Sequence, residues 1–133
     1  MLSHQHTPRI LAIDDDLDTL DLLRVVLKRG GFDISTASSW GEVVDRVNIS
    51  KQNYKPFDLI ILDIMMPDRS GFDIFRSLQV VLDNIPPVIF LSARYSVNDM
   101  VMASDLGAAK YLIKPTTPEK LINTVWEVIK QER

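Results

Sequence analysis

Five short apolar runs recur along the chain, and each is followed by a stretch in which apolar residues have helical spacing. The runs cover residues 9–13, 32–37, 58–62, 88–91 and 110–113. Most of them are too short for helices and too continuous for strands that expose one face to water, so we expect buried parallel strands. Parallel strands need long crossover connections, which the intervening stretches supply. This alternation restricts the chain to an α/β fold.

The stretches between the runs carry signals for helix starts and stops. Leu20, Leu23 and Leu27 fall on one helical face, and Gly30 marks the end of that helix. The remaining predicted helices are 40–47, a helix that starts after Ser70 and ends by Asn84, 97–106, and a helix that opens with Thr117 as N-cap. We expect 50–56 to be a polar, flexible loop. Five strand–helix pairs predict a three-layer domain with right-handed crossovers.

Length and composition narrow the class of protein. With 133 residues the chain suits one domain, which we place at 9–131 after a tail at 1–8. A net charge of −3 without a long basic run argues against direct binding of nucleic acid. The absence of cysteine excludes disulfides, thiolate metal sites and a cysteine nucleophile. No run has the length of a membrane span or the pattern of a signal peptide, so we expect no membrane association and a cytoplasmic location.

Reactive polar residues follow four of the five runs. They are Asp14, Asp15 and Asp16 after the first run, Asp63 after the third, Ser92 after the fourth and Lys114 after the fifth. In an open parallel sheet, ligands bind outside the carboxyl ends of the strands, near the point where the strand order reverses. If the strand order is 2-1-3-4-5, the first and third strands are neighbours, and Asp14, Asp15 and Asp63 converge on one pocket.

The chemistry of this pocket follows from its residue types. Three carboxylates with no nearby histidine or cysteine form a hard-oxygen site, which suits Mg²⁺ or Mn²⁺ rather than zinc. Lys114 and Ser92 would flank the pocket, where an ammonium group and a hydroxyl can bind the oxygens of a phosphoryl group. A carboxylate can accept a phosphoryl group covalently, and Asp63 is the best placed to do so. The pattern therefore predicts metal-assisted phosphorylation of the protein's own aspartate.

Four motifs in order carry a resemblance to a known family. They are "IDDD" (13–16), "LDIMMPDRSG" (62–71), "FLSA" (90–93) and "YLIKP" (111–115). From Arg9 to about Lys130, the chain resembles the receiver domain of bacterial two-component response regulators. The resemblance implies a flavodoxin-like (βα)5 three-layer sandwich with a parallel five-stranded sheet of order 2-1-3-4-5. It also implies a single receiver domain at 9–131, with no output domain in this chain.

The resemblance assigns roles at the acidic pocket. Asp63 matches the aspartate that accepts the phosphoryl group. Asp14 and Asp15 match the acidic pair that holds Mg²⁺ or Mn²⁺, with Asp15 as a direct ligand and Asp14 acting through water. Met65 matches the position whose backbone carbonyl completes the metal site.

Further roles implied by the resemblance fall on the fourth and fifth strands. Ser92 matches the hydroxyl that turns toward the phosphoryl group, and Tyr111 matches the aromatic residue that swings inward with it. Lys114 matches the lysine that pairs with the phosphoryl group, and its bond to Pro115 is expected to be cis. Arg94 lies at a position where side chains influence the lifetime of the phosphoryl group.

The implied function is a phosphorylation-dependent switch. A sensor histidine kinase or a histidine phosphotransfer protein would donate the phosphoryl group, and the domain would catalyse only its own phosphorylation and dephosphorylation. The face made by the fourth helix, fifth strand and fifth helix would bind a downstream protein. Ala109 and Lys110 stand where DNA-binding members often carry two acidic residues that form a dimer, so we expect a monomer or a weak homodimer.

Three rival functions stay open from the sequence. The segment "DDDLDTL" loosely resembles the D-x-D-G-T motif of haloacid-dehalogenase-like phosphatases, whose nucleophile would be Asp14 or Asp16, although Asp18 stands where that motif needs glycine. A flavodoxin-type redox domain fits the fold class, but no glycine-rich or serine- and threonine-rich phosphate loop follows the first strand. A degenerate receiver would bind partners without phosphorylation.

At single positions, a purely structural role competes with the functional one. Asp16 or Asp18 is expected to cap the first helix, since carboxylates favour helix N-termini. Tyr111 could serve only in packing, as aromatic residues in strands often do. The chain could be a stand-alone receiver or a fragment of a longer regulator or hybrid kinase.

Overall fold

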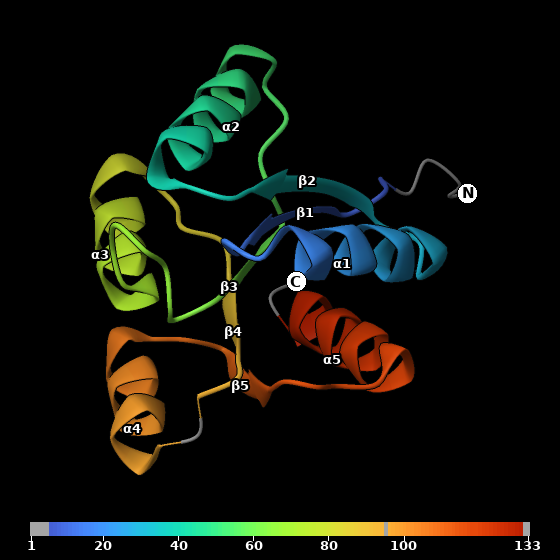
Figure 1. Cartoon of the computed structure of the whole chain (residues 1–133). Helices are drawn as coiled ribbons and strands as arrows, with labels where there is room; N and C mark the ends of the chain where they lie inside the picture. The colour runs from blue at the N-terminus through green and yellow to red at the C-terminus, as the bar shows by residue number, and fades with distance from the viewer. Residues whose placement is uncertain (1–5, 95, 132–133) are drawn as a thin grey trace.

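The fold consists of a parallel sheet with five helices packed on its two faces (Figure 1). The computed structural model describes residues 6–94 and 96–131. The strands are β1 (Arg9–Ile13), β2 (Asp33–Ala37), β3 (Leu59–Leu62), β4 (Val88–Ser92) and β5 (Lys110–Ile113). The helices are α1 (Leu17–Arg29), α2 (Trp40–Gln52), α3 (Gly71–Val81), α4 (Val97–Leu106) and α5 (Pro118–Gln131). The strand order is β2-β1-β3-β4-β5 with every pairing parallel, which confirms the predicted flavodoxin-like fold.

The helices form two layers, one on each face of the sheet. Figure 1 shows α1 and α5 together on one face, whereas α2, α3 and α4 cover the other. Successive residues of a strand point to opposite faces, so the strands serve both layers. In β1, Ile10 and Ala12 join the core under α1 and α5, and Leu11 and Ile13 join the core under the other three helices.

The three central strands are buried along nearly their whole length, as their continuous apolar sequences predict. The two edge strands differ from this expectation, because only one neighbour covers each of them. In β2, Asp33 is exposed and the next three residues are half-buried, and in β5 only Leu112 is buried. The carboxyl ends of β1 and β3 lie side by side, so the residues that follow these two strands meet.

Two helix boundaries differ from the prediction. The helix predicted at 40–47 continues to Gln52, so the predicted loop at 50–56 is wrong for residues 50–52 and begins only after Gln52. Ser50 is buried, and its hydroxyl donates to the carbonyl of Lys55 at 2.8 Å, which ties the helix end to the next segment. The helix predicted to carry Leu82 and to end by Asn84 ends at Val81, because Leu82 already has an extended backbone.

The predicted tail is attached to the domain where the structure describes it. Pro8 is buried, and its carbonyl accepts a hydrogen bond from the backbone N–H of Asp33 at 3.0 Å. The His6 side chain lies 2.9 Å from an Asp58 carboxylate oxygen. The first five residues of the tail lie outside the described part of the chain. No helix in the described part has both the length and the apolar character needed to cross a bilayer.

Candidate functional site

Acidic side chains from two neighbouring strands meet at the carboxyl edge of the sheet. The pairing of Ile13 with Leu62 brings the ends of β1 and β3 together, and the backbone N–H of Asp63 donates to the carbonyl of Ile13 at 3.0 Å. One carboxylate oxygen from each of Asp14, Asp15 and Asp63 lies within 4.8 Å of the others. The predicted convergence of these three residues is therefore present in the structure.

These carboxylates line an open cavity of about 380 Å³, hereafter the acidic cavity, together with Met65 and Lys114. Asp14 and Asp63 are only 2% and 6% exposed, whereas Asp15 is exposed. Burial raises the pKa of the Asp14 carboxyl, although its hydrogen bond with Lys114 acts in the opposite direction. The cavity thus combines the buried carboxylates of Asp14 and Asp63 with the exposed carboxylate of Asp15.

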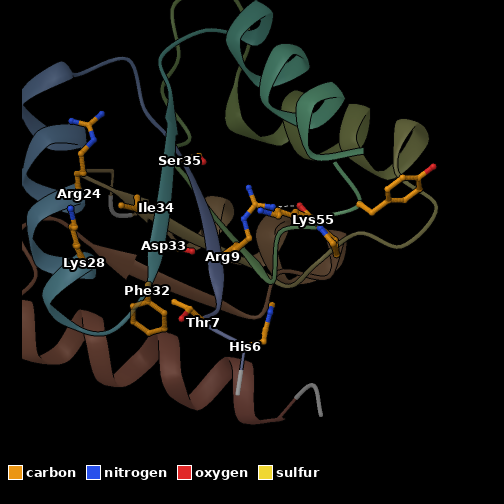
Figure 2. Close-up of a pocket in the computed structure, with 12 residues that line it drawn as sticks. His6, Thr7, Arg9, Arg24, Lys28, Phe32, Asp33, Ile34, Ser35 and Lys55 are labelled. Carbon is orange, nitrogen blue, oxygen red and sulfur yellow. Dashed lines mark hydrogen bonds between the residues drawn. The ribbon is translucent and has the colours of Figure 1, made fainter. Parts of the chain in front are cut away.

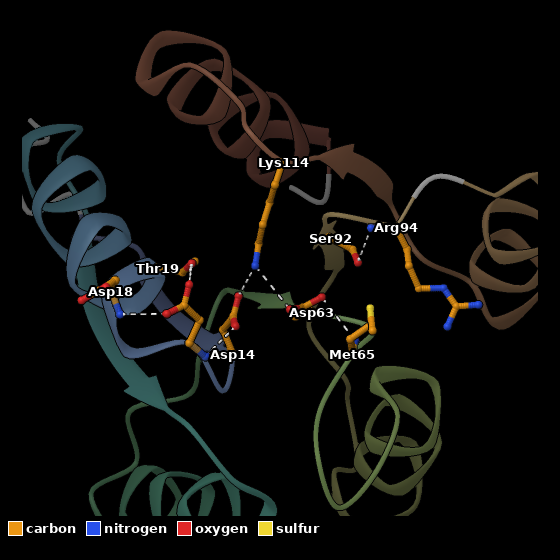
Figure 3. A network of polar contacts seen from close by, with 9 residues as sticks. Asp14, Asp18, Thr19, Asp63, Met65, Ser92, Arg94 and Lys114 are labelled. Atoms are coloured by element: carbon orange, nitrogen blue, oxygen red, sulfur yellow. Dashed lines mark hydrogen bonds and ion pairs between the residues drawn. The ribbon is translucent and has the colours of Figure 1, made fainter.

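Lys114 is the cation that reaches into the acidic cavity. Its Nζ lies 2.7 Å from Asp14 Oδ2 and 3.3 Å from Asp63 Oδ2, and Figure 3 shows it pointing between the two carboxylates. Burial alone would lower the pKa of this ammonium group, but the bonds and charges of Asp14 and Asp63 raise it above the ordinary value. The backbone positions the lysine, because its N–H donates to the carbonyl of Ser92 at 2.9 Å, and the predicted cis bond to Pro115 is confirmed.

The donor set of the acidic cavity could hold a metal ion. Two unit charges about 4 Å apart repel by roughly 4 kcal/mol at the effective dielectric near a protein surface. One lysine offsets only part of the charge of three carboxylates, so a divalent cation would relieve the remaining repulsion. Carboxylate oxygens are ligands that Mg²⁺ and Mn²⁺ prefer, and the part of the chain the structure describes places no cysteine or histidine in the lining.

Asp63 is held in place by the segment that follows it. The backbone N–H of Met65 donates to Asp63 Oδ1 at 3.2 Å, so Met65 lies beside Asp63. Gly71 begins α3 directly against this segment, and its N–H donates to the carbonyl of Ile64 at 2.7 Å. A Cβ atom at Gly71 would lie 2.1 Å from the carbonyl oxygen of Asp63. The sequence pattern assigns Gly71 no role beyond the helix start, so this contact is visible only in the structure.

The third aspartate of the first loop serves the helix rather than the cavity chemistry. Asp16 is the N-cap of α1, where its carboxylate accepts hydrogen bonds from the Asp18 N–H at 3.2 Å and from the Thr19 hydroxyl at 2.7 Å. The Thr19 hydrogen bond lowers the pKa of Asp16. This confirms the capping role that the sequence analysis shared between Asp16 and Asp18, and assigns it to Asp16.

Ser92, at the end of β4, and Tyr111, in β5, both form hydrogen bonds with Arg94. Ser92 ends β4 fully buried, and its hydroxyl accepts from the backbone N–H of Arg94 at 3.2 Å (Figure 3). The Tyr111 hydroxyl donates to the carbonyl of Arg94 at 2.7 Å. Among the described residues, neither hydroxyl is hydrogen-bonded to Asp63. Both hydroxyls are therefore bonded to the backbone of Arg94, in the short loop that follows β4.

Asp99 is a buried acidic residue that the sequence analysis missed. It is 6% exposed in the first turn of α4, and its Oδ2 lies 2.9 Å from the Arg94 guanidinium. Burial and the negative charge of Asp99 raise the pKa of the Tyr111 hydroxyl. An acidic residue in the first turn of a helix is common for reasons of the helix dipole alone, so the sequence carried no distinct signal for this ion pair.

The fold and the acidic cavity together define an α/β domain of the flavodoxin-like class with an acidic site at the switch point of its sheet. The family model described as the response regulator receiver domain matches residues 10–126, and the chain belongs to that family. The resemblance found in the sequence is thereby confirmed. The phosphatase alternative with a first-strand nucleophile finds no support in these comparisons.

Relatives agree on the family but are longer than this chain. The transcriptional regulatory protein PrrA of Mycobacterium leprae is 36% identical over 125 residues, which are 94% of this chain and 51% of that protein. The DNA-binding response regulator MtrA of Mycolicibacterium paratuberculosis is 32% identical over 88% of this chain and 49% of its own length. The chain thus spans about half the length of the curated relatives it matches.

Solved structures match nearly the whole chain. A two-component response regulator from Clostridium difficile superposes with a TM-score of 0.84 at 25% identity, covering 96% of this chain and 99% of that one. The chemotaxis protein CheY4 of Vibrio cholerae superposes with a TM-score of 0.81 at 25% identity, covering 92% and 99%. Both similarities extend over all layers of the fold.

Proposed function

We propose that residues 9–131 act as a phosphorylation-dependent signalling switch, with Asp63 as the phosphoryl acceptor. The observation that carries the proposal is the meeting of Asp14, Asp15 and Asp63 with Lys114 around one open cavity. Asp63 is the member of this group that touches both the lysine and the loop leading to α3. Family membership supports the assignment, because receiver domains belong to signalling proteins.

In the proposed reaction, a carboxylate oxygen of Asp63 attacks the phosphorus of a phosphohistidine. The new P–O bond forms as the P–N bond breaks, and the electron pair stays on the leaving imidazole. Lys114, already between the two buried carboxylates, would donate hydrogen bonds to the transferring oxygens. Asp14 and Asp15, with the backbone carbonyl of Met65, would hold Mg²⁺ or Mn²⁺. When bound, the cation would neutralise negative charge on the carboxylates and phosphoryl oxygens.

The proposed donor is a sensor histidine kinase or a histidine phosphotransfer protein. The proposed response begins at Ser92, whose hydroxyl would turn from the Arg94 N–H toward the phosphoryl group. Tyr111 would then exchange its bond to the Arg94 carbonyl for an inward position, which would alter the face formed by α4, β5 and α5. A downstream protein would bind this face.

Labelling tests the acceptor. Incubation with Mg²⁺ and a small acyl phosphate should add one phosphoryl group to the wild-type protein, seen as a gain in intact mass. Asp63→Asn should gain no phosphoryl group and keep its circular dichroism spectrum, while Asp68→Asn, which changes an exposed acid of the same loop, should react like the wild type.

Three results would contradict the proposal. Equal labelling of Asp63→Asn would show that another residue accepts the phosphoryl group. A phosphoryl group mapped to Asp14 or Asp16 would support the phosphatase alternative instead. No labelling of the wild type by any donor, including phosphohistidine proteins, would indicate a receiver that binds partners without phosphorylation.

A further inference from the structure

A groove of about 720 Å³ runs along the outer edge of β2, hereafter the β2 groove. β2 is a terminal strand of the sheet, so this side of it has no neighbouring strand among the described residues. The groove lies at the amino-terminal ends of β1 and β2, since Arg9 and Asp33 line it. The acidic cavity follows the carboxyl end of β1, so the two features occupy different ends of the same strand.

The outer edge of β2 presents unpaired backbone groups. The N–H of Asp33 donates to Pro8 and the carbonyl of Ala37 accepts from Asp14, so these residues turn their backbone groups toward β1. Backbone groups alternate in direction along a strand, and those of Ile34 and Thr36 therefore face outward. Arg46 Nε donates to the Thr36 carbonyl at 3.0 Å. Within residues 6–94 and 96–131, this leaves both groups of Ile34 and the N–H of Thr36 for another strand.

Basic side chains flank this edge on both sides of β2, from α1, from β1 and from the loop before β3. Figure 2 shows Arg24 and Lys28 on one side of the strand. Arg9 and Lys55 lie on its other side. Within the described part of the chain, the ammonium groups of Lys28 and Lys55 have no ion-pair partner. Asp33 is the acidic residue of the lining, so the groove is basic although the whole chain has a net charge of −3.

We propose that the β2 groove docks an extended acidic segment of another protein, which adds to the sheet as a strand beside β2. Backbone hydrogen bonds to Ile34 and Thr36 would supply affinity, and carboxylates facing Lys28 and Lys55 would supply selectivity. A second copy of this chain is a poor occupant, because two β2 edges would bring the same basic residues together. This interaction is separate from phosphorylation at Asp63.

A defined peptide tests the proposal. The probe is an acetylated and amidated peptide of repeated Glu-Glu-Val-Val, which presents glutamates on both faces of a strand, titrated into ¹⁵N-labelled protein. The amide signals of Ile34 and Thr36 should shift, and their hydrogen exchange should slow. The same peptide with N-methyl groups on the residues that face β2 should not bind, because it lacks the strand hydrogen bonds.

Charge variants test the selectivity. Lys28→Glu and Lys55→Glu should each weaken peptide binding by roughly fivefold. Lys120→Glu makes the same charge change at an exposed position outside the groove and should leave binding unchanged. Asp63→Asn should bind the peptide like the wild type, which separates this result from the test of the phosphoryl acceptor.

Several outcomes would overturn the proposal. They are no binding of the glutamate–valine peptide at millimolar concentration, equal binding of a lysine–valine peptide, and equal binding of the N-methylated peptide. Shifts at Ile34 and Thr36 with single-stranded DNA that match those with the peptide, together with no effect of N-methylation, would mean that the groove is a general electropositive surface.

Discussion

At the scale of single residues, the chemistry of the acidic cavity depends on a glycine that is not part of it. Gly71 packs so closely on the backbone of Asp63 that a side chain at position 71 would displace either the start of α3 or the Asp63 backbone. The displacement would reach the carboxylate, because the Asp63 side chain is fixed by its own loop through Met65. The start of α3 thus positions the backbone of Asp63, and Lys114 contacts its carboxylate.

Gly71→Ala is expected to lower the free energy of unfolding by about 2 kcal/mol or more, since the added methyl group meets rigid backbone. Urea unfolding measures this change, and phosphoryl labelling of the folded variant should also slow. Gly41→Ala is the matched control, because a Cβ there meets only Ser39 Oγ at 3.9 Å. That change, at the exposed second residue of α2, should alter the stability by less than about 0.5 kcal/mol. Equal stability of the two alanine variants would contradict the close approach at Gly71.

At the scale of elements, α2 shows how local signals compete. Its end has the hydrogen bonds of a Schellman motif, in which Lys55 N–H donates to Ser50 and Tyr54 N–H donates to Lys51. Tyr54 occupies the position where glycine is usual and has a φ of +54°. No glycine marks this helix end in the sequence, in which residues 50–56 are predicted to form a polar loop. In the folded protein, Tyr54 adopts the left-handed conformation and α2 extends to Gln52.

Tyr54→Gly is expected to stabilise the protein by about 1 kcal/mol, because glycine adopts a left-handed conformation without a steric cost. Tyr54 is 92% exposed, so little packing is lost with its ring. Thermal unfolding would register a higher melting temperature. Tyr54→Ala removes the ring but keeps the Cβ, and should give no such increase. If both variants shift the melting temperature equally, the backbone conformation is not the cause.

The start of α2 gives a prediction about pH. Glu42 accepts hydrogen bonds from the backbone N–H of Ser38 at 2.6 Å and from the Ser38 hydroxyl at 2.8 Å, which lower its pKa from an ordinary value of 4.5. A carboxyl group whose pKa is lower in the folded protein stabilises it above the unfolded pKa, and loses this effect as the pH falls through the folded value. Wild type should therefore be more stable than Glu42→Gln at neutral pH. This difference in the free energy of unfolding should shrink progressively as the pH falls below about 4.5.

Urea unfolding of wild type and Glu42→Gln between neutral and acid pH measures this difference. Glu119→Gln provides a control at an exposed position in the first turn of another helix. A stability difference between wild type and Glu42→Gln that does not change with pH would mean that the Glu42 charge has no part in capping α2.

At the scale of the whole molecule, one sheet joins two apolar cores and ends at the acidic cavity. Residues that alternate along β1 and β3 contribute to both cores, so the two helical layers should unfold together. The carboxyl ends of the same strands hold the charges of Asp14 and Asp63. Any ligand that relieves their repulsion in the folded protein should therefore stabilise the entire domain.

Mg²⁺ is expected to raise the melting temperature of the wild-type protein in one cooperative transition, and EDTA should reverse the effect. At a concentration about 100 times the dissociation constant, the stabilisation would be about 2.7 kcal/mol. Asp15→Ala should reduce this gain, because it removes one carboxylate of the cavity and, being exposed, leaves the cores intact. Asp105→Ala, which removes an exposed acid from α4, should retain it. Equal Mg²⁺ stabilisation of Asp15→Ala and wild type would contradict metal binding by Asp15.

Several parts of the fold and cavity could be predicted because their signals are local. Apolar continuity marked the strands β1, β3 and β4, and a capping residue marked the start of α5 at Thr117. Asp14 and Asp63 were found because residues that follow parallel strands must share one edge of the sheet. The end of α2 at Gln52 was missed, since it depends on contacts of Ser50 and Lys55 rather than on a stop signal.

By itself, the sequence determined the α/β class, the family and the acids that meet beside Lys114, because periodicity and strand ends are properties of neighbouring residues. Only the tertiary structure decided the contact of Gly71 with Asp63, the pairing of Arg94 with buried Asp99, and the basic groove beside β2. The physical reason is that side-chain burial, close approach and charge pairing depend on which distant segments pack together, and no local pattern records the distances between them.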